Sequence, residues 1–321
     1  MKEFVLEVSS LSKTFKVQSK RGQNQLVQAV RDVSFNIARN ETVALVGESG
    51  CGKSTTGLAV LRLIEPTSGE IHFQGKDLCS LKARELRKNR SQFQMVFQNP
   101  RSQLDPRMLI EDSIAEPLKA FKYGSKAEIK NRVREVLELV GLDPSFASRY
   151  PHQVSGGQRQ RVGIARAIAS NPALIVLDEA IASLDVSVQT QVMNLLLDLQ
   201  EKLCVSYLFI SHNMSSVKYL ADRIVVMYLG RVVETAPADE FFKSPRHPYS
   251  QALLSAVPSP SVKVKNQPIL LTGDIPSPFN VPSGCVFRTR CPKAQEICSQ
   301  VIPESKQVTP GTFVSCHFPL E

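Results

Sequence analysis

A glycine-rich segment near the start of the chain has the residue types needed to bind phosphate. It follows an apolar stretch at 42–46 and fits the pattern G-x-x-x-x-G-K-S. Its residues, with the threonine that follows them, are Gly47, Glu48, Ser49, Gly50, Cys51, Gly52, Lys53, Ser54 and Thr55. Backbone N–H groups of such a loop surround phosphate oxygens, and the next helix adds partial positive charge at its N-terminus. The pattern predicts that Lys53 contacts the β- and γ-phosphates of a nucleotide and that Ser54 binds Mg²⁺.

A second chemical signal is the acidic pair Asp178 and Glu179, which follows the apolar segment 174–177. Such a segment is typical of a buried strand, and open α/β sheets bind ligands at the carboxyl ends of their strands. We expect Asp178 to hold Mg²⁺, directly or through water, and Glu179 to act as general base on the attacking water. An isolated Asp-Glu pair is more often a solvated turn, but the phosphate loop upstream favours catalysis.

The elements that must position these residues follow from the apolar pattern. We expect strands at 5–8, 33–37, 42–46, 174–177 and 207–210, and a hairpin formed by 224–227 and 231–234. Ser125 and Glu128 form a capping-box pattern ahead of a helix that ends near Gly141, and a second helix is expected at 188–203. Strands that alternate with helices predict a mostly parallel sheet covered on both faces.

Composition places the chain among globular proteins. Of its 321 residues 42% are hydrophobic and 21% are charged, with a formal net charge of +9. No apolar run reaches the roughly 18 residues of a membrane span, and the N-terminus has no signal-peptide pattern, so a cytosolic protein is the default expectation. The densest basic run, 82–90, has no interleaved aromatic residues, so we expect a solvated surface rather than a nucleic-acid site.

The composition changes after residue 236, where 13 of the 20 prolines and four of the seven cysteines lie. We therefore place a boundary near Thr235 and expect 236–321 to be a loop-rich extension rather than more of the sheet. Cys285, Cys291, Cys298 and Cys316 are clustered in this extension with C-x5-C-x6-C-x17-C spacing. Reducing conditions favour metal ligands over disulfides, and the open spacing fits an iron-sulfur cluster at least as well as zinc. Four unmetallated thiols remain the alternative, and the isolated Cys51, Cys79 and Cys204 are expected to be small core residues.

A further motif lies shortly before the acidic pair. Ser155, Gly156, Gly157 and Gln158 begin a segment that resembles the signature motif of ATP-binding cassette (ABC) ATPases. The resemblance implies an α/β fold, the P-loop NTPase ABC nucleotide-binding domain, over 1–235. That domain has a RecA-like parallel-sheet core, an N-terminal antiparallel β subdomain and a helical signature subdomain at about 100–165. ATP and Mg²⁺ are the implied ligands.

The resemblance also implies roles for single residues. Gln98, within Val96–Pro100, matches the Q-loop and is expected near metal and water, and His212 matches the switch histidine that contacts the γ-phosphate. Asp185, after Ser183 and Leu184, matches the D-loop. Phe15 lies where the family stacks an aromatic ring on adenine. Each residue taken alone has a plainer explanation: Phe15 as a core residue, His212 as a structural histidine.

The signature motif implies an assembly as well. In the family, the signature segment contacts the γ-phosphate held by an opposing subunit, so one set of motifs implies a dimer. The segment after Glu179 departs from the family, which usually has Pro-Thr-Ser-Ala-Leu-Asp. Here Ala180, Ile181 and Ala182 follow the glutamate. We expect this change to loosen the loop that communicates across the dimer.

The extension narrows the family. The segment 245–254, PRHPYSQALL, with the prolines and cysteines after it, is similar to the C-terminal extension of ATPases of dipeptide, oligopeptide and nickel importers. The segment 96–106 is similar too, although Gln103-Leu104-Asp105 replaces the usual Ser-Leu-Asn. The resemblance implies an ATP-hydrolysing importer subunit at the cytoplasmic face of the inner membrane. Implied partners are two transmembrane permeases, a second related ATPase in a heterodimer, and an extracytoplasmic substrate-binding protein. A 4Fe-4S cluster at the four cysteines is also implied.

Three other functions stay open at this stage. The cargo of the importer is a peptide by resemblance alone, so nickel or another small solute is an alternative. A soluble non-transport ABC ATPase that acts on DNA or ribosomes is less favoured, because such proteins commonly have tandem cassettes or long coiled-coil insertions. A regulatory subunit with poor turnover is the third possibility, suggested by the Ala180-Ile181-Ala182 departure.

Overall fold

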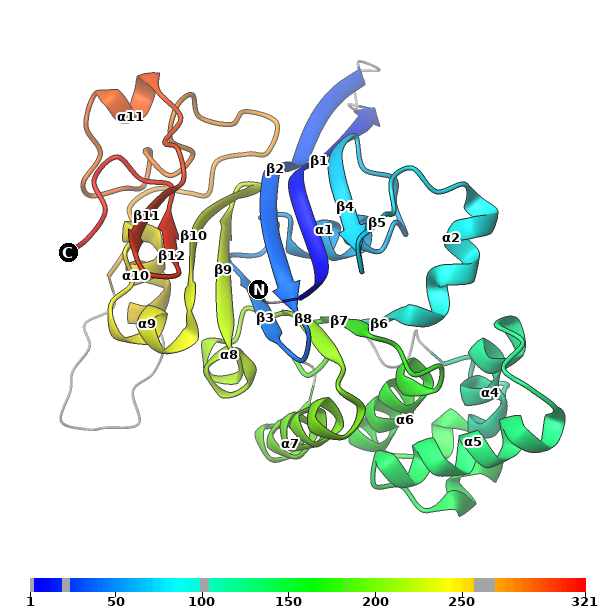
Figure 1. Cartoon of the computed structure of the whole chain (residues 1–321). Coiled ribbons are helices and arrows are strands. Elements are labelled where there is room, and N and C mark those ends of the chain that lie inside the picture. Colours follow the sequence, from blue (N-terminus) through cyan, green and yellow to red (C-terminus); the bar gives the residue numbers. More distant parts are fainter. Residues whose placement is uncertain (1–2, 19–23, 99–103, 183, 257–268) are drawn as a thin grey trace. The chain divides into compact units, whose positions relative to one another are not determined.

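The computed structural model describes residues 3–18, 24–98, 104–182, 184–256 and 269–321 (Figure 1). The chain forms two compact units, each built from segments that are distant in sequence. The first unit contains Met1–Val5, Ile37–Thr42 and Ser80–Phe209, and the second contains Leu6–Asn36, Val43–Cys79 and Ile210–Glu321. Asn99, Pro100 and Gln103 of the segment 96–106, and Ser183 of the D-loop motif, lie outside the described residues.

The first unit contains parallel strands and most of the long helices. Strands β6 (Phe93–Val96) and β7 (Leu174–Asp178) pair in parallel, with Phe93 opposite Leu174 and Val96 opposite Leu177. Strand β8 (Ser206–Ile210) is next to β7 and, like β7, is buried along its whole length. Burial on both faces explains why these strands are continuous apolar runs in the sequence rather than alternating patterns. The strands predicted at 174–177 and 207–210 are thus confirmed.

The helical part of the first unit consists of α4 (Ile110–Ala120), α5 (Lys126–Leu139) and α6 (Gly156–Ile168), which pack on one another (Figure 1). The capping box predicted at the start of α5 is present: the Glu128 N–H donates to Ser125 Oγ at 3.3 Å, and the Ser125 N–H donates to a Glu128 carboxylate oxygen at 2.7 Å. Buried Arg132 of α5 donates to the Ile168 and Ala169 carbonyls at the end of α6. A cation at a helix C-terminus is favourable, so this contact helps to hold the two helices together.

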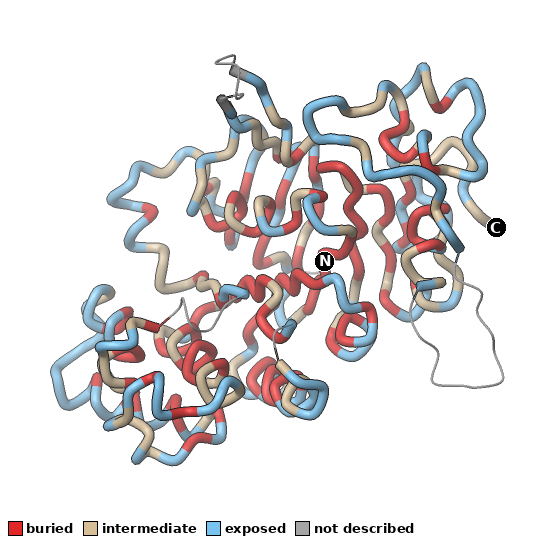
Figure 2. The backbone as a smooth tube through the Cα atoms, turned by 180° about the vertical axis from the view of Figure 1, so that it is seen from behind, coloured by how far each residue is buried: buried red, intermediate tan, exposed pale blue. Residues whose placement is uncertain are grey.

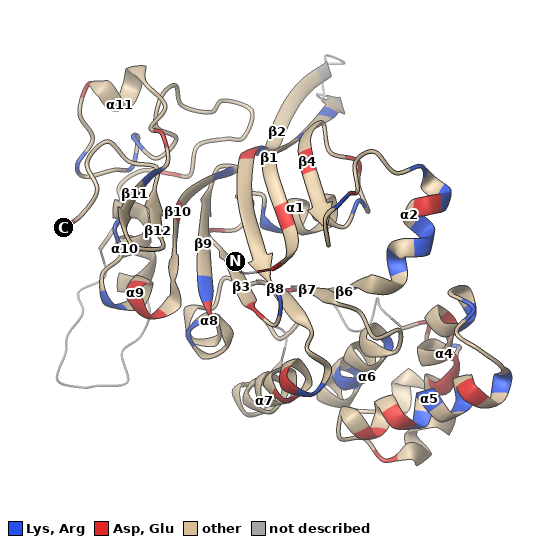
Figure 3. Ribbon diagram, in the orientation of Figure 1, with Lys and Arg blue, Asp and Glu red and all other residues tan. Residues whose placement is uncertain are grey.

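Two further α-helices and three short 3-10 turns complete the first unit around these elements. Helix α7 (Val186–Leu203) begins two residues before the helix predicted at 188–203, and short 3-10 turns lie at Arg90–Gln92, Pro144–Ser148 and Pro151–Gln153. The densest basic run forms α2 (Ala83–Asn89), whose only buried residue is Leu86 (Figure 3). The charged side chains of α2 therefore form a solvated surface, as the sequence predicted.

The second unit contains an antiparallel sheet of order β2-β1-β4-β5. Its strands are β1 (Phe4–Gln18), β2 (Asn24–Ala38), β4 (Ser68–Phe73) and β5 (Lys76–Asp77). Strands β1 and β2 are much longer than the predicted 5–8 and 33–37, because polar residues alternate with apolar ones outside those short apolar cores. Figure 2 shows the resulting mixture of buried and exposed positions along the chain.

The second unit also contains the strand that leads into the phosphate loop. Strand β3 (Thr42–Val46) has the bounds predicted and pairs in parallel with β9 (Arg223–Tyr228), which forms the predicted hairpin with β10 (Arg231–Pro237). The helices of this unit are α1 (Lys53–Val60), α8 (Met214–Leu220), α9 (Ala238–Lys243), α10 (Pro248–Ser255) and α11 (Ile297–Gln300).

The extension adds strands to the sheet, which corrects one expectation. Strand β12 (Thr312–Val314) pairs antiparallel with β10 and with β11 (Lys306–Thr309), so the order in this unit is β11-β12-β10-β9-β3. The sheet is therefore mixed rather than mostly parallel. The physical reason is that β12 covers the unpaired edge of β10. A turn signal at Pro310-Gly311, between two short β-prone segments, marks this hairpin in the sequence.

Candidate functional site

The predicted phosphate loop connects β3 to α1, in the strand-to-helix position that its pattern requires. Lys53, the first residue of α1, donates from Nζ to the carbonyl oxygens of Gly47 at 2.8 Å and Glu48 at 2.9 Å. The Lys53 side chain is buried, with 5% of its surface exposed. These contacts hold the ammonium group against the backbone of the loop, where a charged phosphate would meet it.

Two glycines of the loop have no room for a side chain. Gly47 has a φ of +150° and Gly52 a φ of +104°, in the region that favours glycine. A Cβ on Gly47 would lie 2.2 Å from the Met227 carbonyl oxygen, and a Cβ on Gly52 would lie 2.2 Å from the Ala29 carbonyl oxygen. The glycines are therefore required by the close approach of neighbouring backbone as well as by the turn itself.

We expect Gly52→Ala to lower the free energy of unfolding by roughly 2–5 kcal/mol, because the left-handed backbone costs about 1–2 kcal/mol and the backbone clash adds about 1–3 kcal/mol. Urea denaturation measures the change. Gly75→Ala is the matched control, because Gly75 has a φ of +74° but nothing within 4 Å of its Cβ position, so only the conformational cost remains. Equal losses for the two variants would show that the contact with Ala29 is unimportant.

The acidic pair and the Q-loop residue come together in the first unit. Asp178 is the last residue of β7 and is 9% exposed, and Glu179 follows it with a φ of +47°. Gln98 Nε2 donates to Glu179 Oε2 at 2.6 Å. A non-glycine residue in the left-handed region is uncommon and often marks a functional position. The structure thus joins two of the three residues predicted to be catalytic.

The signature residues begin α6. Ser155 is the N-cap: its Oγ accepts from the Gln158 N–H at 3.2 Å, and Gln158 Oε1 accepts from the Ser155 N–H at 2.9 Å. A Cβ on Gly157 would lie 2.5 Å from Val188 Cγ1, whereas nothing lies within 4 Å of the Cβ position of Gly156. Packing within this chain therefore accounts for glycine at 157 but not for glycine at 156.

The segment after Glu179 is anchored by packing. Ala180 and Ile181, which depart from the family pattern, are buried with 1% and 2% exposure. Asp185 is the N-cap of α7, where its Oδ1 accepts from Ser187 Oγ at 2.7 Å and from the Val188 N–H at 3.0 Å. Both hydrogen bonds lower the pKa of Asp185, and the bond from Ser187 has a larger effect than the bond from Val188. Ala180 and Ile181 are therefore core contacts, whereas Ala182 is exposed, and the expected loosening of this loop stays a prediction.

Two predicted nucleotide contacts of the second unit are exposed. Phe15, on β1, has 37% of its surface exposed, and Lys13 Nζ lies 5.0 Å from its ring centroid. His212 precedes Asn213, the N-cap of α8, and is also exposed. The alternative of a core phenylalanine is therefore wrong for Phe15, whereas the two roles considered for His212, structural histidine and switch histidine, stay predictions. Ser54 belongs to the second unit and Asp178 to the first, so their shared Mg²⁺ site stays a prediction.

The four clustered cysteines are free thiols in the second unit. The Cys285 N–H donates to the Cys298 carbonyl at 2.8 Å, and burial raises the pKa of the thiols of Cys285 and Cys291 and raises that of Cys316 to about 11. Across the described residues, no group of three or more His, Cys, Asp or Glu side chains is placed to hold a metal ion. The predicted four-ligand arrangement is therefore not seen.

The isolated cysteines differ from one another. Cys51 is buried in the phosphate loop, with its Sγ 3.7 Å from Lys53 Nζ, and burial raises its pKa. Cys79 is half-buried. Cys204 is exposed, so the expectation of a core residue is wrong there. Its backbone, with a φ of 51°, ends α7 in the left-handed C-cap conformation, which puts the residue at the surface.

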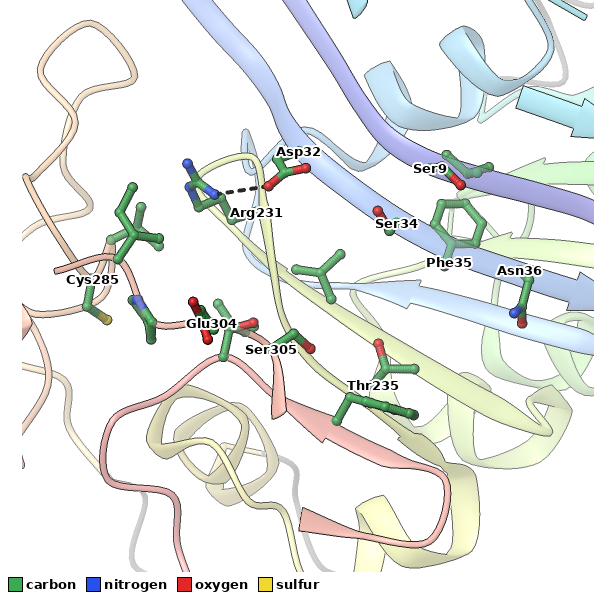
Figure 4. Close-up of a pocket in the computed structure, with 18 of the residues that line it drawn as sticks. Ser9, Asp32, Ser34, Phe35, Asn36, Arg231, Thr235, Cys285, Glu304 and Ser305 are labelled. Carbon is green, nitrogen blue, oxygen red and sulfur yellow. Dashed lines mark ion pairs between the residues drawn. The ribbon is translucent and has the colours of Figure 1, made fainter. Parts of the chain in front are cut away.

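A cavity of about 760 Å³ lies elsewhere in the second unit (Figure 4). Strands β1, β2, β9 and β10 and the extension line it, and the Asp32–Arg231 ion pair, at 4.0 Å, spans part of its wall. Of the residues predicted to be functional, only Cys285 contributes to the lining. The cavity contains no part of the phosphate loop, so it is not the nucleotide site.

Sequence reasoning missed two residues that touch the phosphate loop. The Arg290 guanidinium pairs with the Glu48 carboxylate, and Tyr249 Oη accepts from the Glu48 N–H. They lie 242 and 201 positions from Glu48 along the chain. No local spacing pattern connects residues so far apart, although Tyr249 lies inside the segment that resembles importer ATPases.

Within the described part of the chain, no helix is both long and apolar enough to cross a bilayer.

Comparisons with known proteins agree with the motifs. The model of the family "ABC transporter" matches residues 30–182, and that of "Oligopeptide/dipeptide transporter, C-terminal region" matches residues 233–298. The oligopeptide transport ATP-binding protein AppF of Bacillus subtilis is 48% identical over 320 residues, which cover 98% of this chain and 97% of AppF. A protein of Brucella ovis is 49% identical over 312 residues, 97% of each chain.

Solved structures show the same fold. The dimeric post-hydrolysis state of an ATP-binding cassette bound to ADP and Pi matches with a TM-score of 0.65 and 30% identity, over 73% of this chain and 98% of that one. CbiO1 of Clostridium perfringens, part of the CbiONQ ABC transporter complex, matches with a TM-score of 0.66 and 28% identity, over 75% of this chain and 91% of that one. With a phosphate loop, a signature helix and a C-terminal region that each match, the chain belongs to the ABC transporter ATPases, in the oligopeptide/dipeptide transporter family.

Proposed function

We propose that this chain is the ATP-hydrolysing subunit of a membrane importer of dipeptides or oligopeptides. The observation that carries the proposal is the combination of a complete set of ABC nucleotide motifs with a C-terminal region of the oligopeptide/dipeptide transporter type. AppF, which is similar over nearly the whole chain, is named for oligopeptide transport. The importer role therefore follows from the extension, and ATP hydrolysis follows from the motifs.

The chemistry assigned to the site is the transfer of a γ-phosphoryl group to water. Lys53 and the N–H groups of the loop bind the phosphates. Ser54, Asp178 and Gln98 would hold Mg²⁺, and the bound ion would neutralise the negative charge that develops on the phosphate oxygens. Glu179 takes a proton from the attacking water as the bond from the γ-phosphorus to the ADP oxygen breaks. Gln98, whose amide nitrogen contacts the Glu179 carboxylate at 2.6 Å, orients that base. Phe15 and His212 contact the adenine and the γ-phosphate.

The signature helix contributes to the nucleotide of a second cassette. Ser155 and the first turn of α6 present a helix N-terminus, which favours an anion. The open space at the Cβ position of Gly156 is explained if a ligand from outside the chain approaches the backbone there. Asp185 lies at the start of the next helix and would face the same dimer contact. A second, related ATPase is the proposed partner, with two permeases and a substrate-binding protein completing a complex at the cytoplasmic face of the membrane.

Purification of the tagged chain from membranes tests the assembly. We expect two permeases and a second cassette ATPase to copurify, and the complex, reconstituted with its binding protein, to take up peptides in an ATP-dependent manner. Uptake of ⁶³Ni²⁺ without peptide uptake would assign the cargo to the nickel branch. A chain recovered with nucleic acid and without permeases would contradict the importer role.

We also propose that Cys285, Cys291, Cys298 and Cys316 bind a 4Fe-4S cluster. The support is that all four belong to one segment of the second unit and that thiolates are the usual ligands of such clusters. The thiols of the described structure are not placed as a ligand set, so the mechanism above uses no cluster. Anaerobic purification with iron, sulfide and zinc analysis provides the test. About four irons per chain with broad visible absorbance would support the cluster, and zinc alone or no metal would contradict it.

A further inference from the structure

The C-terminal extension makes a charged contact with the phosphate loop. Arg290 Nη1 lies 2.7 Å from Glu48 Oε2, and Arg290 Nη2 lies 3.2 Å from Glu48 Oε1. The pair is bidentate and shielded from solvent, because the side chains are only 9% and 24% exposed. This is the fork geometry in which arginine binds a carboxylate most strongly.

The residues before Arg290 hold it in place. The Arg288 N–H donates to the Cys285 carbonyl and the Arg290 N–H to the Phe287 carbonyl, so this part of the extension is a series of tight turns. The Phe287 ring is fully buried and packs edge-on against Tyr228, with centroids 5.2 Å apart, and at a tilt against Tyr249, with centroids 5.3 Å apart. The aromatic cluster of Tyr228, Tyr249 and Phe287 therefore fixes the start of the arginine side chain.

A second contact reaches the backbone of the same loop residue. Tyr249 Oη accepts from the Glu48 N–H at 2.8 Å. Tyr249 itself is placed by His247, the N-cap of α10, whose Nδ1 accepts from the Tyr249 N–H at 3.0 Å. Burial lowers the pKa of His247 to about 3, so the ring is neutral and can accept this bond. The extension thus holds Glu48 by both its side chain and its backbone.

The carboxylate of Glu48 adds a negative charge to the phosphate loop, and Arg290 neutralises that charge. Glu48 lies between Gly47 and Ser49 in a loop whose ligand is a polyphosphate anion. An unpaired carboxylate there would repel the phosphates and work against Lys53. A buried bidentate arginine cancels that charge and leaves the positive field of Lys53 and the helix N-terminus to act on the nucleotide.

We propose that Arg290 is a positioning residue of the nucleotide site, which neutralises Glu48 and fixes the phosphate loop, so that the extension sets the affinity for ATP. The inference rests on the proposed role of 47–54 as the phosphate loop. It assigns the C-terminal extension a role in nucleotide binding, in addition to any role in transport.

The test is a double-mutant cycle in the full-length chain, read out as the Kd of MgATP and MgADP by competition with a fluorescent nucleotide. Arg290→Met is expected to raise both Kd values about tenfold or more. In the Glu48→Gln background, the same substitution is expected to cost threefold or less, because no carboxylate is left to repel the phosphates. Arg290→Lys keeps the charge but loses the fork, and should have an intermediate effect.

Salt separates an electrostatic role from a structural one. Raising the ionic strength from about 0.1 to 1 M shortens the Debye length from about 10 to 3 Å, so the ratio of the Kd values of Arg290→Met and wild type should fall. A ratio that does not change with salt, together with an equal cost in the Glu48→Gln background, would mean that Arg290 only holds the fold, and would overturn the proposal.

Arg288→Met is the matched control. Arg288 lies in the same turns, but its guanidinium contacts the carbonyl and hydroxyl oxygens of Ser283 rather than Glu48. Its nucleotide Kd should equal that of wild type. Unchanged Kd values for folded Arg290→Met, with binding lost in Lys53→Ala, would overturn this inference and leave the proposed function intact. Unchanged binding in Lys53→Ala would instead contradict the phosphate loop. If Arg290→Met does not fold, Glu48→Gln alone measures the charge effect: it leaves the Arg290 charge unpaired beside the phosphates, so its Kd for MgATP should fall, and an unchanged or higher Kd would overturn the proposal.

Discussion

Lys53→Ala is expected to raise the Kd of MgATP at least 100-fold. The Lys53 ammonium is 5% exposed and donates to the Gly47 and Glu48 carbonyls, so it is held at the loop before any phosphate arrives. Charge-assisted hydrogen bonds contribute about 1.5–3 kcal/mol each, and two lost contacts to phosphate oxygens amount to roughly 3–6 kcal/mol. A tenfold change in Kd corresponds to about 1.4 kcal/mol, which gives a factor of 100 or more.

Equilibrium binding of a fluorescent nucleotide measures this effect, with thermal unfolding to confirm the fold. Lys76→Ala serves as the control, since Lys76 is an exposed lysine on β5 of the same unit. Its Kd should match that of wild type. Tight MgATP binding by Lys53→Ala would mean that the ammonium group is not a phosphate ligand, and the assignment of the whole loop would then fail.

The parts of the fold that were predictable are those encoded by neighbouring residues. Strand β3 has the predicted bounds because five successive apolar or β-branched residues end at a glycine. Helix α5 begins where the Ser125–Glu128 capping box places it. In both cases the interactions that fix the element lie within a few positions of one another, so the pattern is visible in the sequence.

The contacts that were not predictable join residues far apart along the chain. Nothing near Glu48 indicates that Arg290 neutralises it, and the composition of the extension gave no sign that β12 would cover the edge of β10. The turn at Pro310-Gly311 predicts a hairpin, but the strand that it pairs with depends on which edge is open. Such pairings are determined by tertiary packing rather than by local propensity.

The candidate nucleotide site also combines features that were predictable from the sequence with features that were not. The acidic pair after an apolar strand identified Glu179 as a general base, and the resemblance to a family identified Gln98, but only the structure shows the 2.6 Å contact between them. For Phe15, residue type alone allowed a core role, and its exposure decides against that role. For the four cysteines, their spacing in the sequence suggested a set of metal ligands that the described thiols do not form. Sequence spacing does not determine the conformation of the loops between them.

The second large effect is expected for Glu179→Gln. A general base contributes typically 10²- to 10⁴-fold to a rate, so we expect the ATPase turnover of the assembled complex to fall at least 100-fold while MgATP binding is retained. Glutamine has the same shape and keeps an oxygen that can accept from Gln98 Nε2, so the local geometry is preserved and only the basicity is removed. The measurement is phosphate release from the complex under single-turnover conditions, with nucleotide Kd determined in parallel.

Glu201→Gln is the matched control, because Glu201 is an exposed acidic residue on α7 of the same unit, and its turnover should equal that of wild type.

The turnover of Glu179→Gln also decides whether this chain is an active or a regulatory subunit. If buried Ala180 and Ile181 keep the segment after Glu179 in place, this chain hydrolyses ATP and the glutamine variant stops it. Unchanged turnover in Glu179→Gln would show that the hydrolysis comes from the partner ATPase, and this chain would then bind nucleotide without being the site of catalysis.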